Sequence, residues 1–267
     1  MMHFKPRKNR ILAELVKGKV PLGMQIYTGD PSFIEILALA GFDFYMLDME
    51  HSRINIETME HCMRAADAAG ITSVIRVPEN NPTHIRYSIE AGAQGVIVPH
   101  VKNKEDAKRA VDAIRYPPEG KCGICTAIRA ANYSTPAWEE YIEHSSKETI
   151  LIPILEDPEA IDKAEEIFAE LKPGTDAVWF GRGDLAQAIR KAGEKIPWDD
   201  PYIAKAFDKV LTISKRTGIP TMAIPWPNLT YECAREAMDK GARIMLYSIE
   251  QLLFYNLCLD IVKNLKR

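Results

Sequence analysis

Residues 40–51 read AGFDFYMLDMEH and contain the unit that is repeated along the chain. A helical pattern over 31–40 ends at Gly41, which fits a left-handed helix C-cap, and an apolar run over 43–48 follows it. The same order recurs at the AGI, AGA and KGA sequences further along. Because most of these runs are apolar almost throughout, they indicate parallel strands that are covered on both faces.

Eight such runs are expected to be strands. They lie at residues 22–27, 43–48, 72–77, 95–99, 149–155, 176–180, 219–224 and 243–247. Helical patterns separate them, for example at 31–40, 56–69, 82–91, 104–114 and 158–171. This alternation predicts an α/β fold, a (β/α)8 TIM barrel, rather than an open sheet. An open doubly wound sheet would more often carry a glycine-rich phosphate loop after its first strand, and TGDPS stands there instead.

The composition limits the possible partners and the compartment. The 267 residues are 46% hydrophobic and include 34 basic and 37 acidic side chains, which gives a net charge of −3. Without a basic excess we expect no nucleic-acid partner, and no apolar run approaches the roughly 18–20 residues of a membrane span. Five cysteines suggest no disulfide framework, and the N-terminal segment lacks the apolar region of a secretory signal, so we expect a cytoplasmic protein.

No linker divides the sequence, so residues 1–267 are expected to form a single barrel domain with an insertion at about 116–148. Insertions of this length are usually lids, binding loops or subunit contacts. Because monomers rarely expose large apolar patches, we expect the insertion and a helix over 251–266 to contact other subunits. The helix could instead be the eighth barrel helix. The apolar residues concerned are Ile124, Ile128, Tyr133 and Trp138 in the insertion, and Leu252, Leu253, Phe254, Tyr255 and Leu257 in the helix.

Two carboxylates follow neighbouring strands at the end of the barrel where active sites lie. Glu156 follows the fifth predicted strand and Asp184 follows the sixth. Since adjacent parallel strands are ~4.8 Å apart, both carboxylates can reach one cation, and without a cation they would repel each other. Mg²⁺ and Mn²⁺ accept such ligands. Alternatively, each carboxylate caps the helix that follows it.

Arg76 and His51 are the other candidates at the strand ends. Arg76 lies inside an apolar strand, so its guanidinium needs an anion, either a structural carboxylate or a substrate. His51 follows Asp48 and Glu50, and a histidine oriented by carboxylates can act as a general base, although a structural hydrogen-bonded role is the alternative. None of the eight strand segments contains a lysine for Schiff-base chemistry, which favours a metal-stabilised enolate.

Six motifs follow one another in the chain: AGFDFYMLDMEH, VIRVPENNP, GAQGVIVPHVKNKEDA, RYPPEGKCG, ILEDPEA and WFGRGDLA. In this order they resemble the HpcH/HpaI family of class II pyruvate aldolases, from about Gly23 to Gly241. The resemblance implies a TIM barrel that binds pyruvate through a divalent metal ion (Mg²⁺, Mn²⁺ or Co²⁺). It implies reversible cleavage of a 4-hydroxy-2-oxo acid into pyruvate and an aldehyde. It also implies a homo-oligomer, a hexamer that exchanges C-terminal helices.

The resemblance also implies roles for individual residues. Glu156 and Asp184 match the metal ligands, and Arg76 matches the arginine that stabilises the enolate oxygen. His51 matches the base, and Glu90 occupies the position of an acidic residue that raises its basicity. The expected catalytic group is therefore His51, Arg76, Glu90 and Asp48. The expected substrate-binding group is Arg76 with the loop Gly181, Arg182, Gly183 and Asp184, whose backbone amides match those that hold the substrate carboxylate.

The chain departs from the family pattern at several positions. Met49 stands where glycine is usual, Gln25 where tryptophan is common, and Ile154 where glutamine is common. Cys122 replaces an arginine and Arg182 replaces a proline. These changes leave the metal and enolate residues in place and affect the acceptor pocket. The Arg182 guanidinium either faces solvent or pairs with a nearby carboxylate, or it binds an acidic acceptor.

Two other functions remain open from the sequence. The related citrate lyase β-subunit and malyl-CoA lyase families share the barrel and a similar set of Arg, Glu and Asp. Against them, no clear basic groove for a CoA nucleotide is visible, and the histidine of LDMEH fits the pyruvate aldolases better. The departures could also mark a degenerate barrel that binds an oxo acid without catalysis.

Overall fold

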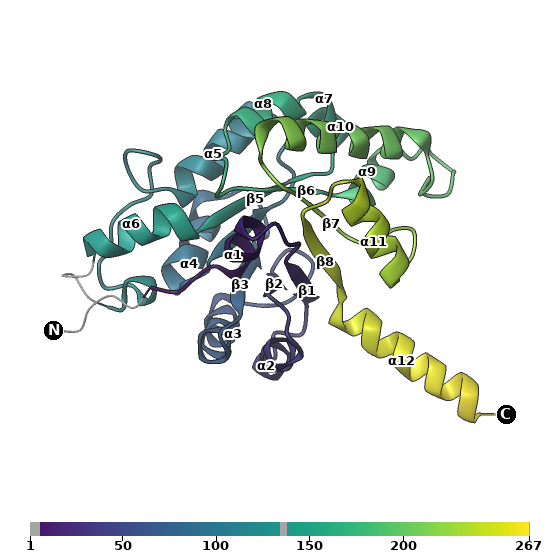
Figure 1. The fold of residues 1–267 in the computed structure, drawn as a ribbon, viewed down its shortest axis with the longest axis horizontal. Coiled ribbons are helices and arrows are strands. Elements are labelled where there is room, and N and C mark those ends of the chain that lie inside the picture. The colour runs from purple at the N-terminus through teal and green to yellow at the C-terminus, as the bar shows by residue number, and fades with distance from the viewer. Residues whose placement is uncertain (1–5, 134–137, 267) are drawn as a thin grey trace.

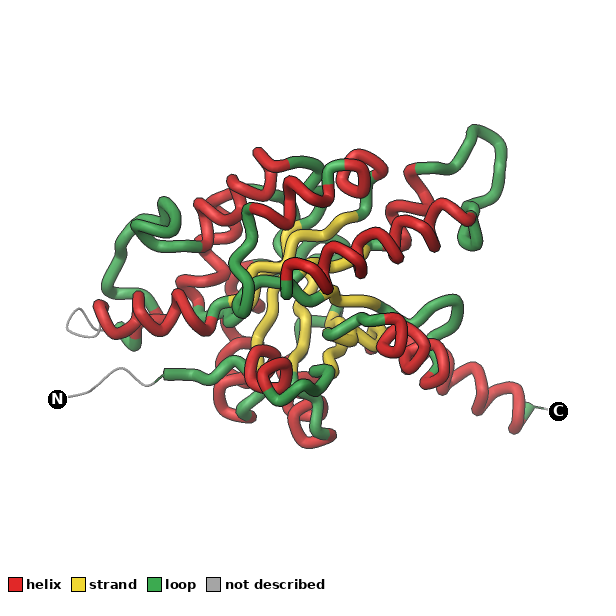
Figure 2. The backbone as a smooth tube through the Cα atoms, turned by 45° about the horizontal axis from the view of Figure 1, so that its top comes forward, coloured by secondary structure: helices red, strands yellow, loops and turns green. Residues whose placement is uncertain are grey.

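Eight parallel strands close into a barrel in the computed structural model, which describes residues 6–133 and 138–266. Each strand pairs with its neighbours in chain order, and the first strand closes the ring against the eighth. The strands are β1 (Leu22–Ile26), β2 (Phe44–Asp48), β3 (Thr72–Arg76), β4 (Gly95–Val98), β5 (Ile150–Leu155), β6 (Val178–Phe180), β7 (Thr221–Ala223) and β8 (Ile244–Ile249). The predicted (β/α)8 TIM barrel is confirmed, and helices surround the strands in Figures 1 and 2.

The helices begin and end at residues typical of helix caps. They are α1 (Arg10–Val16), α2 (Pro31–Ala40), α3 (Ile56–Ala69), α4 (Pro82–Ala91), α5 (Lys104–Ile114), the 3-10 helix η1 (Arg129–Ala131), α6 (Trp138–Glu148), α7 (Pro158–Asp162), α8 (Ala164–Ala169), α9 (Arg182–Ala188), α10 (Pro201–Thr217), α11 (Tyr231–Lys240) and α12 (Glu250–Leu265). The Asp30 and Asn55 side chains accept backbone N–H groups at the starts of α2 and α3. Gly41 and Gly70 end these helices at φ of 93° and 74°, the left-handed conformation that glycine adopts most easily.

Side chains on each strand alternate between the barrel interior and the surrounding helices. On β2, Phe44 and Met46 belong to the buried cluster inside the barrel, whereas Tyr45 and Leu47 belong to the cluster between strands and helices. The next inward position on this strand is Asp48, at its C-terminal end. The alternation that builds the core therefore also points the last inward residue of a strand into the barrel mouth.

Part of the insertion after β4 packs against the chain itself. Trp138, at the start of α6, packs against Tyr116 and Tyr141 with ring centroids 5.3 Å from each. Ile128 and Trp138 are only 8% and 7% exposed, so the chain itself covers these two side chains without another subunit. Ile124 remains exposed, as does Tyr133. The helix expected over 158–171 is two short helices, because the chain turns at Lys163 between α7 and α8.

The C-terminal helix does not lie along the barrel in the way that an eighth barrel helix would. Figure 1 shows α12 extending away from the strands, and its main contacts with the barrel are to β1 and β8. Most of its apolar side chains are consequently exposed, among them Leu252, Phe254, Tyr255 and Leu257.

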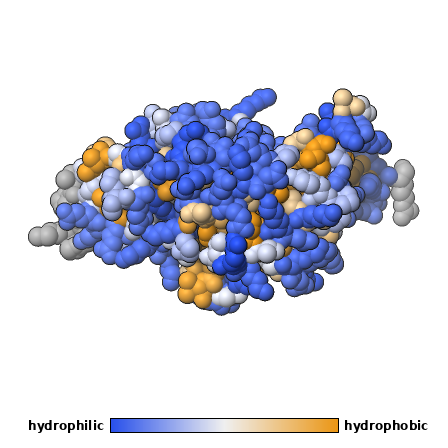
Figure 3. Space-filling model, turned by 90° about the horizontal axis from the view of Figure 1, so that it is seen from above, coloured by the Kyte–Doolittle hydropathy of each residue, from blue (hydrophilic) through white to orange (hydrophobic). Residues whose placement is uncertain are grey.

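The surface seen in Figure 3 is mostly hydrophilic, with separate apolar patches. Among the described helices, none combines the length and the apolar character needed to cross a membrane.

Candidate active site

Three charged residues face inward at the C-terminal ends of strands β2, β3 and β5. Asp48 ends β2, Arg76 ends β3 and Glu156 follows β5, each two residues after an inward-facing Met46, Val74 or Ile154. All three are at most 4% exposed. Buried charges need partners, so their arrangement decides what this end of the barrel can bind.

Asp48 and Arg76 form a buried ion pair that fixes the guanidinium. The Arg76 Nη2 donates to Asp48 Oδ2, and its Nη1 lies 3.3 Å from Glu50 Oε2. Asp48 Oδ1 also accepts the backbone N–H groups of Glu50 and His51, both at 2.9 Å. Burial opposes the charge on Arg76, but the Asp48 and Glu50 carboxylates outweigh it, and the pKa of the guanidinium is raised. The anion partner that the sequence required for Arg76 is therefore Asp48.

Glu156 is a buried carboxylate that has little compensation for its charge. Its Oε1 accepts the backbone N–H of His100 at 2.8 Å. Burial, with a smaller contribution from the nearby Asp184 and Glu50 carboxylates, raises the pKa of Glu156 to about 7 against the lowering effect of His100. Such a group is poised to bind a cation or to exchange a proton.

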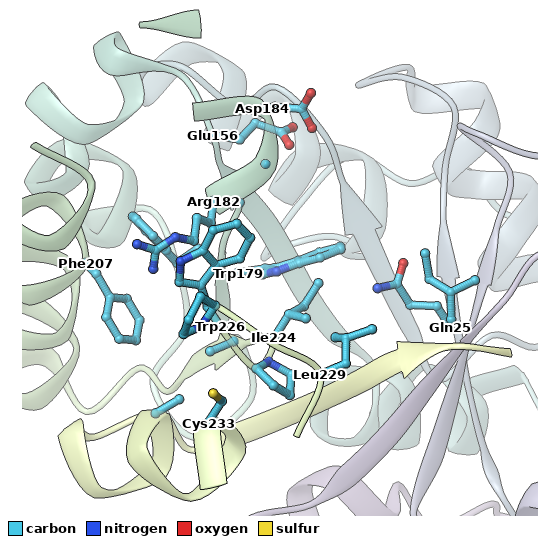
Figure 4. Close-up of a pocket in the computed structure, with 18 of the residues that line it drawn as sticks. Gln25, Glu156, Trp179, Arg182, Asp184, Phe207, Ile224, Trp226, Leu229 and Cys233 are labelled. Atoms are coloured by element: carbon cyan, nitrogen blue, oxygen red, sulfur yellow. The ribbon is translucent and has the colours of Figure 1, made fainter. Parts of the chain in front are cut away.

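Asp184 lies in the first turn of α9, and its carboxylate is beside that of Glu156 in Figure 4. The loop that positions it begins at Gly181, where backbone and carboxylate come very close. A Cβ atom at Gly181 would lie 2.5 Å from Glu156 Cβ and 3.0 Å from Glu156 Oε2. Glycine is therefore needed at Gly181 to bring the Asp184 loop against Glu156.

Two histidines surround Glu50 above the ion pair. The Nε2 atoms of His51 and His100 lie 3.7 Å from Glu50 Oε2 and Oε1 respectively. The His100 Nδ1 is 3.3 Å from Asp157 Oδ2. Partial burial opposes the charge on His100, but the Glu156, Asp157 and Glu50 carboxylates outweigh it and raise its pKa. Burial likewise raises the pKa of Glu50 in spite of Arg76 and the histidines.

Glu90 is the one expected site residue that the structure does not bring to this group. It is the penultimate residue of α4, which runs back from the mouth towards the other end of the barrel. Its Oε1 lies 4.0 Å from Arg86 Nε, and Glu90 acts electrostatically on Tyr116 and Cys122. Within the described chain, the carboxylate beside His51 is Glu50.

A cavity of about 460 Å³ connects the charged residues at the barrel mouth to an aromatic region. Glu156, Arg76, His51 and the loop 181–184 line one part of it. The other part is lined by side chains that include Trp179, Trp198, Phe207, Ile224, Trp226 and Leu229. Figure 4 shows the carboxylates of Glu156 and Asp184 at one side and Trp226, Phe207 and Leu229 at the other.

Arg182 belongs to the aromatic part of the cavity. Its Cζ lies 4.5 Å from the centroid of the Trp226 ring, and its Nη2 donates to the Trp198 carbonyl oxygen at 3.5 Å. Burial lowers the pKa of its guanidinium, with a smaller opposing effect of Asp199. The structure thus places the Arg182 guanidinium half-buried against an aromatic ring, a position that the sequence did not suggest.

Sequence reasoning gave no role to His100 or Trp179. The Pro99-His100 pair stands at the end of β4, so its position at the mouth was visible in the sequence. Its contact with Glu156 depends on a left-handed backbone at His100, with φ of 51°, which the sequence does not reveal. Trp226, in the loop after β7, also lines the cavity.

A model of the HpcH/HpaI aldolase/citrate lyase family matches residues 22–255. The chain belongs to this family. It is 32% identical over 206 residues to the 2-dehydro-3,6-dideoxy-6-sulfogluconate aldolase of Pseudomonas putida, covering 77% of this chain and 78% of that protein. It is 31% identical over 213 residues to the 5-keto-4-deoxy-D-glucarate aldolase of Escherichia coli O139:H28, covering 80% of each. The prediction of an enzyme of this aldolase family is thereby confirmed.

Solved structures of the HpcH/HpaI family share the fold over nearly the whole chain. A family protein from Burkholderia cenocepacia J2315 aligns with a TM-score of 0.86 at 25% identity, covering 97% of this chain and 100% of that one. The citrate synthase SbnG aligns with a TM-score of 0.82 at 26% identity, covering 95% and 96%. Three of the departures from the family pattern lie at the site, since Gln25 and Arg182 line the cavity and Ile154 fills the barrel below Glu156.

Proposed function

We propose that the chain is a divalent-metal-dependent aldolase that reversibly cleaves a 4-hydroxy-2-oxo acid into pyruvate and an aldehyde. The observation that carries the proposal is a single cavity in which Glu156 and Asp184 lie at neighbouring strand ends, with the buried cation Arg76. Fixed positive charge in an enclosed site suits a substrate whose oxygen becomes negative during the reaction. The aldolases among the relatives support the same reaction class.

The chemistry around the two carboxylates fits a divalent cation. Burial, and to a smaller extent repulsion from Asp184, raises the pKa of Glu156, and a shared cation would offset both unfavourable effects. Within residues 6–133 and 138–266, no three His, Cys, Asp or Glu side chains are grouped to hold a metal. We therefore expect Glu156 and Asp184 to hold Mg²⁺, Mn²⁺ or Co²⁺ together with substrate and water oxygens. When bound, the cation supplies the Lewis acidity that polarises the 2-oxo group.

Arg76 orients the 2-oxo acid and stabilises the charge that develops on its oxygen. The Asp48 carboxylate holds the guanidinium at one side, while Arg76 Nε has no hydrogen-bond partner among the described residues. A fixed donor needs no reorganisation as the carbon–carbon bond breaks. Asp48 acts through Arg76 and is a positioning residue. The backbone amides of residues 181–184 are proposed to bind the substrate carboxylate.

His51 accepts the proton of the 4-hydroxyl group in cleavage, directly or through a water molecule, and returns it in condensation. Its ring is half exposed at the cavity, and its backbone N–H is held by Asp48. Glu50 lies beside its Nε2, so within one chain Glu50 takes the place that the family resemblance gives to Glu90. A carboxylate beside an imidazole orients the ring and supports its basicity.

An aldol-cleavage assay before and after chelation tests the metal requirement. We expect EDTA to abolish pyruvate release from a 4-hydroxy-2-oxo acid, and Mg²⁺, Mn²⁺ or Co²⁺ to restore it. Full activity in EDTA, or no recovery with any of the three ions, would contradict the metal part of the proposal.

Parallel assays separate this proposal from the two alternatives that the sequence left open. Turnover of acyl-CoA thioesters in place of free 2-oxo acids would indicate a lyase of the citrate lyase or malyl-CoA type. Calorimetric binding of pyruvate without exchange of its methyl protons in D₂O would indicate a binding protein. We expect exchange of these protons and turnover of free 2-oxo acids.

The exposed apolar face of α12 supports the further proposal that the chain forms a homo-oligomer. Phe254, Tyr255 and Leu257 are 66%, 61% and 57% exposed, more than monomers usually leave uncovered in one place. We expect light scattering at micromolar concentration to give a mass well above the 30.1 kDa of one chain. A monomeric mass would contradict this proposal and leave the proposed reaction standing.

A further inference from the structure

The part of the cavity away from the carboxylates has a wall of aromatic rings. The loop between α9 and α10 contributes Trp198, and the loop after β7 contributes Trp226, with ring centroids 5.2 Å apart. Phe207, Ile224 and Leu229 extend this wall. The Arg182 guanidinium lies on the Trp226 ring and holds it in place. Aromatic faces of this kind bind flat, apolar groups.

Three residues that line the cavity each have a buried side-chain N–H group without a hydrogen-bond partner in the described chain. These groups are the indole Nε1 of Trp179, the indole Nε1 of Trp226 and the Nε of Arg182. Trp179 is only 4% exposed, so its unpaired N–H is enclosed by the protein. Because these donors have almost no accessible surface, a ligand in this part of the cavity meets mainly the faces and edges of the rings.

A polyhydroxylated chain is poorly matched to the same wall. Each hydroxyl group both donates and accepts, so it loses bonds to water unless acceptors are also present. The Trp198 carbonyl oxygen is already used by Arg182, and the carboxylate of Glu236, which also lines the cavity, is paired with Lys240 at 2.7 Å. The two aldolase relatives described above are named after sugar-derived acids. The wall therefore points to a different acceptor in this chain.

We propose that the acceptor aldehyde carries a flat, apolar substituent, such as an aryl group, that stacks on Trp226 and Trp198. The inference rests on the proposed aldolase function and specifies its second substrate. In condensation, the pyruvate methyl carbon loses a proton and bonds to the aldehyde carbon, whose oxygen takes up a proton to become the 4-hydroxyl group. Trp226 and Trp198 determine specificity and touch neither of the carbon atoms that join.

The experiment compares benzaldehyde with glyceraldehyde as acceptors for pyruvate, with Mn²⁺ present. We expect the ratio of their kcat/KM values to fall about tenfold or more in Trp226→Ala, within the range of roughly 10–200-fold known for small apolar contacts. The intrinsic reactivity of each aldehyde cancels when variant and wild type are compared. Tyr231→Ala is the matched control, because Tyr231 is 68% exposed, stacks on Tyr247 and does not line the cavity. We expect it to leave the ratio within about twofold.

Trp198→Ala provides a second variant if Trp226→Ala does not fold, because the Trp198 ring is 39% exposed. An unchanged ratio in both variants would overturn the inference, as would a wild-type preference for glyceraldehyde or for the anionic succinic semialdehyde. Exchange of pyruvate methyl protons in D₂O is measured alongside. Exchange without aryl preference refutes the inference and leaves the proposed function intact, whereas no exchange and no turnover refutes both.

Discussion

The buried charges at the two ends of the barrel differ in how fully the chain supplies their partners. At the N-terminal ends of the strands, Arg115 and Asp176 form an ion pair that is at most 3% exposed. Arg115 also donates to the Thr149 carbonyl oxygen at 2.7 Å, and Asp176 accepts the backbone N–H groups of Leu151 and Lys172 at 3.1 and 2.9 Å. The chain itself satisfies this pair.

At the mouth, the polar groups are only partly satisfied by the chain. Arg76 is held by Asp48, yet its Nε has no partner among the described residues, and Trp179 beneath it has an unpaired indole N–H. Glu156 is buried beside another carboxylate. This contrast indicates that the Arg115–Asp176 pair stabilises the barrel, whereas the groups at the mouth are arranged for a ligand.

The largest expected effect is a loss of stability when the Arg115–Asp176 pair is broken. Replacing Asp176 by alanine leaves the Arg115 guanidinium buried without a counter-charge, which typically costs about 3–5 kcal/mol. We expect urea denaturation to show a loss of this size in the free energy of unfolding, with unchanged kcat for the molecules that remain folded. The double variant Arg115→Met/Asp176→Leu should recover most of the loss, because it removes both charges. A double variant as unstable as the single one would contradict this account.

Glu156→Gln tests whether a buried charge at the mouth serves activity rather than stability. Removing this carboxylate should lower kcat/KM for aldol cleavage by about 10²–10³-fold, the typical cost of losing a group that stabilises developing charge. The free energy of unfolding in EDTA should be unchanged or higher, because burial raises the pKa of Glu156 and makes its ionised form unfavourable in the folded chain. Urea denaturation at pH 8 checks this, and a large loss of stability would show that Glu156 stabilises the fold.

A smaller effect, on metal affinity, is expected when the Asp184 loop is pushed away from Glu156. In Gly181→Ala the new Cβ would lie 2.7 Å from Ile154 Cγ2 as well as against Glu156, so the carboxylate must move. We expect Mn²⁺ affinity to fall about 10–100-fold, as when the groups that orient metal ligands are changed. Gly183→Ala is the control within the same loop, because a Cβ there meets nothing within 4 Å. Equal losses of Mn²⁺ affinity in both variants would show that the loop tolerates no side chain at all.

The barrel and its inward carboxylates could be predicted from the sequence because both follow from local patterns. Apolar runs placed the eight strands, and the rule that active sites lie at their C-terminal ends placed Asp48, Arg76 and Glu156 at the mouth. The need of Arg76 for an anion could also be predicted, since a buried guanidinium requires one. The sequence could not choose between a carboxylate of the chain and a substrate, and the structure shows Asp48.

The parts that could not be predicted depend on how loops fold over the mouth. His100 reaches Glu156 and Glu50 through one residue in a left-handed conformation. The aromatic wall forms where two separate loops bring Trp198 and Trp226 together. Glu90 was assigned by its place in a motif, and the direction of α4 takes it away from His51 within the chain. Linear spacing carries no information about such convergence.

Arg182→Pro gives the smallest expected effect and asks whether the cation at the mouth binds a substrate carboxylate. Arg182 is the first residue of α9, a position where proline fits a helix, so the change removes the charge with little distortion. Because the guanidinium stacks on Trp226, we expect the loss of a cation–π contact of about 0.5–1 kcal/mol, or roughly two- to fivefold in kcat/KM. The loss should be equal for succinic semialdehyde and glycolaldehyde, with Mn²⁺ affinity unchanged. A rise in KM confined to succinic semialdehyde, equivalent to about 1.5–3 kcal/mol, would instead show that Arg182 binds the acceptor's carboxylate.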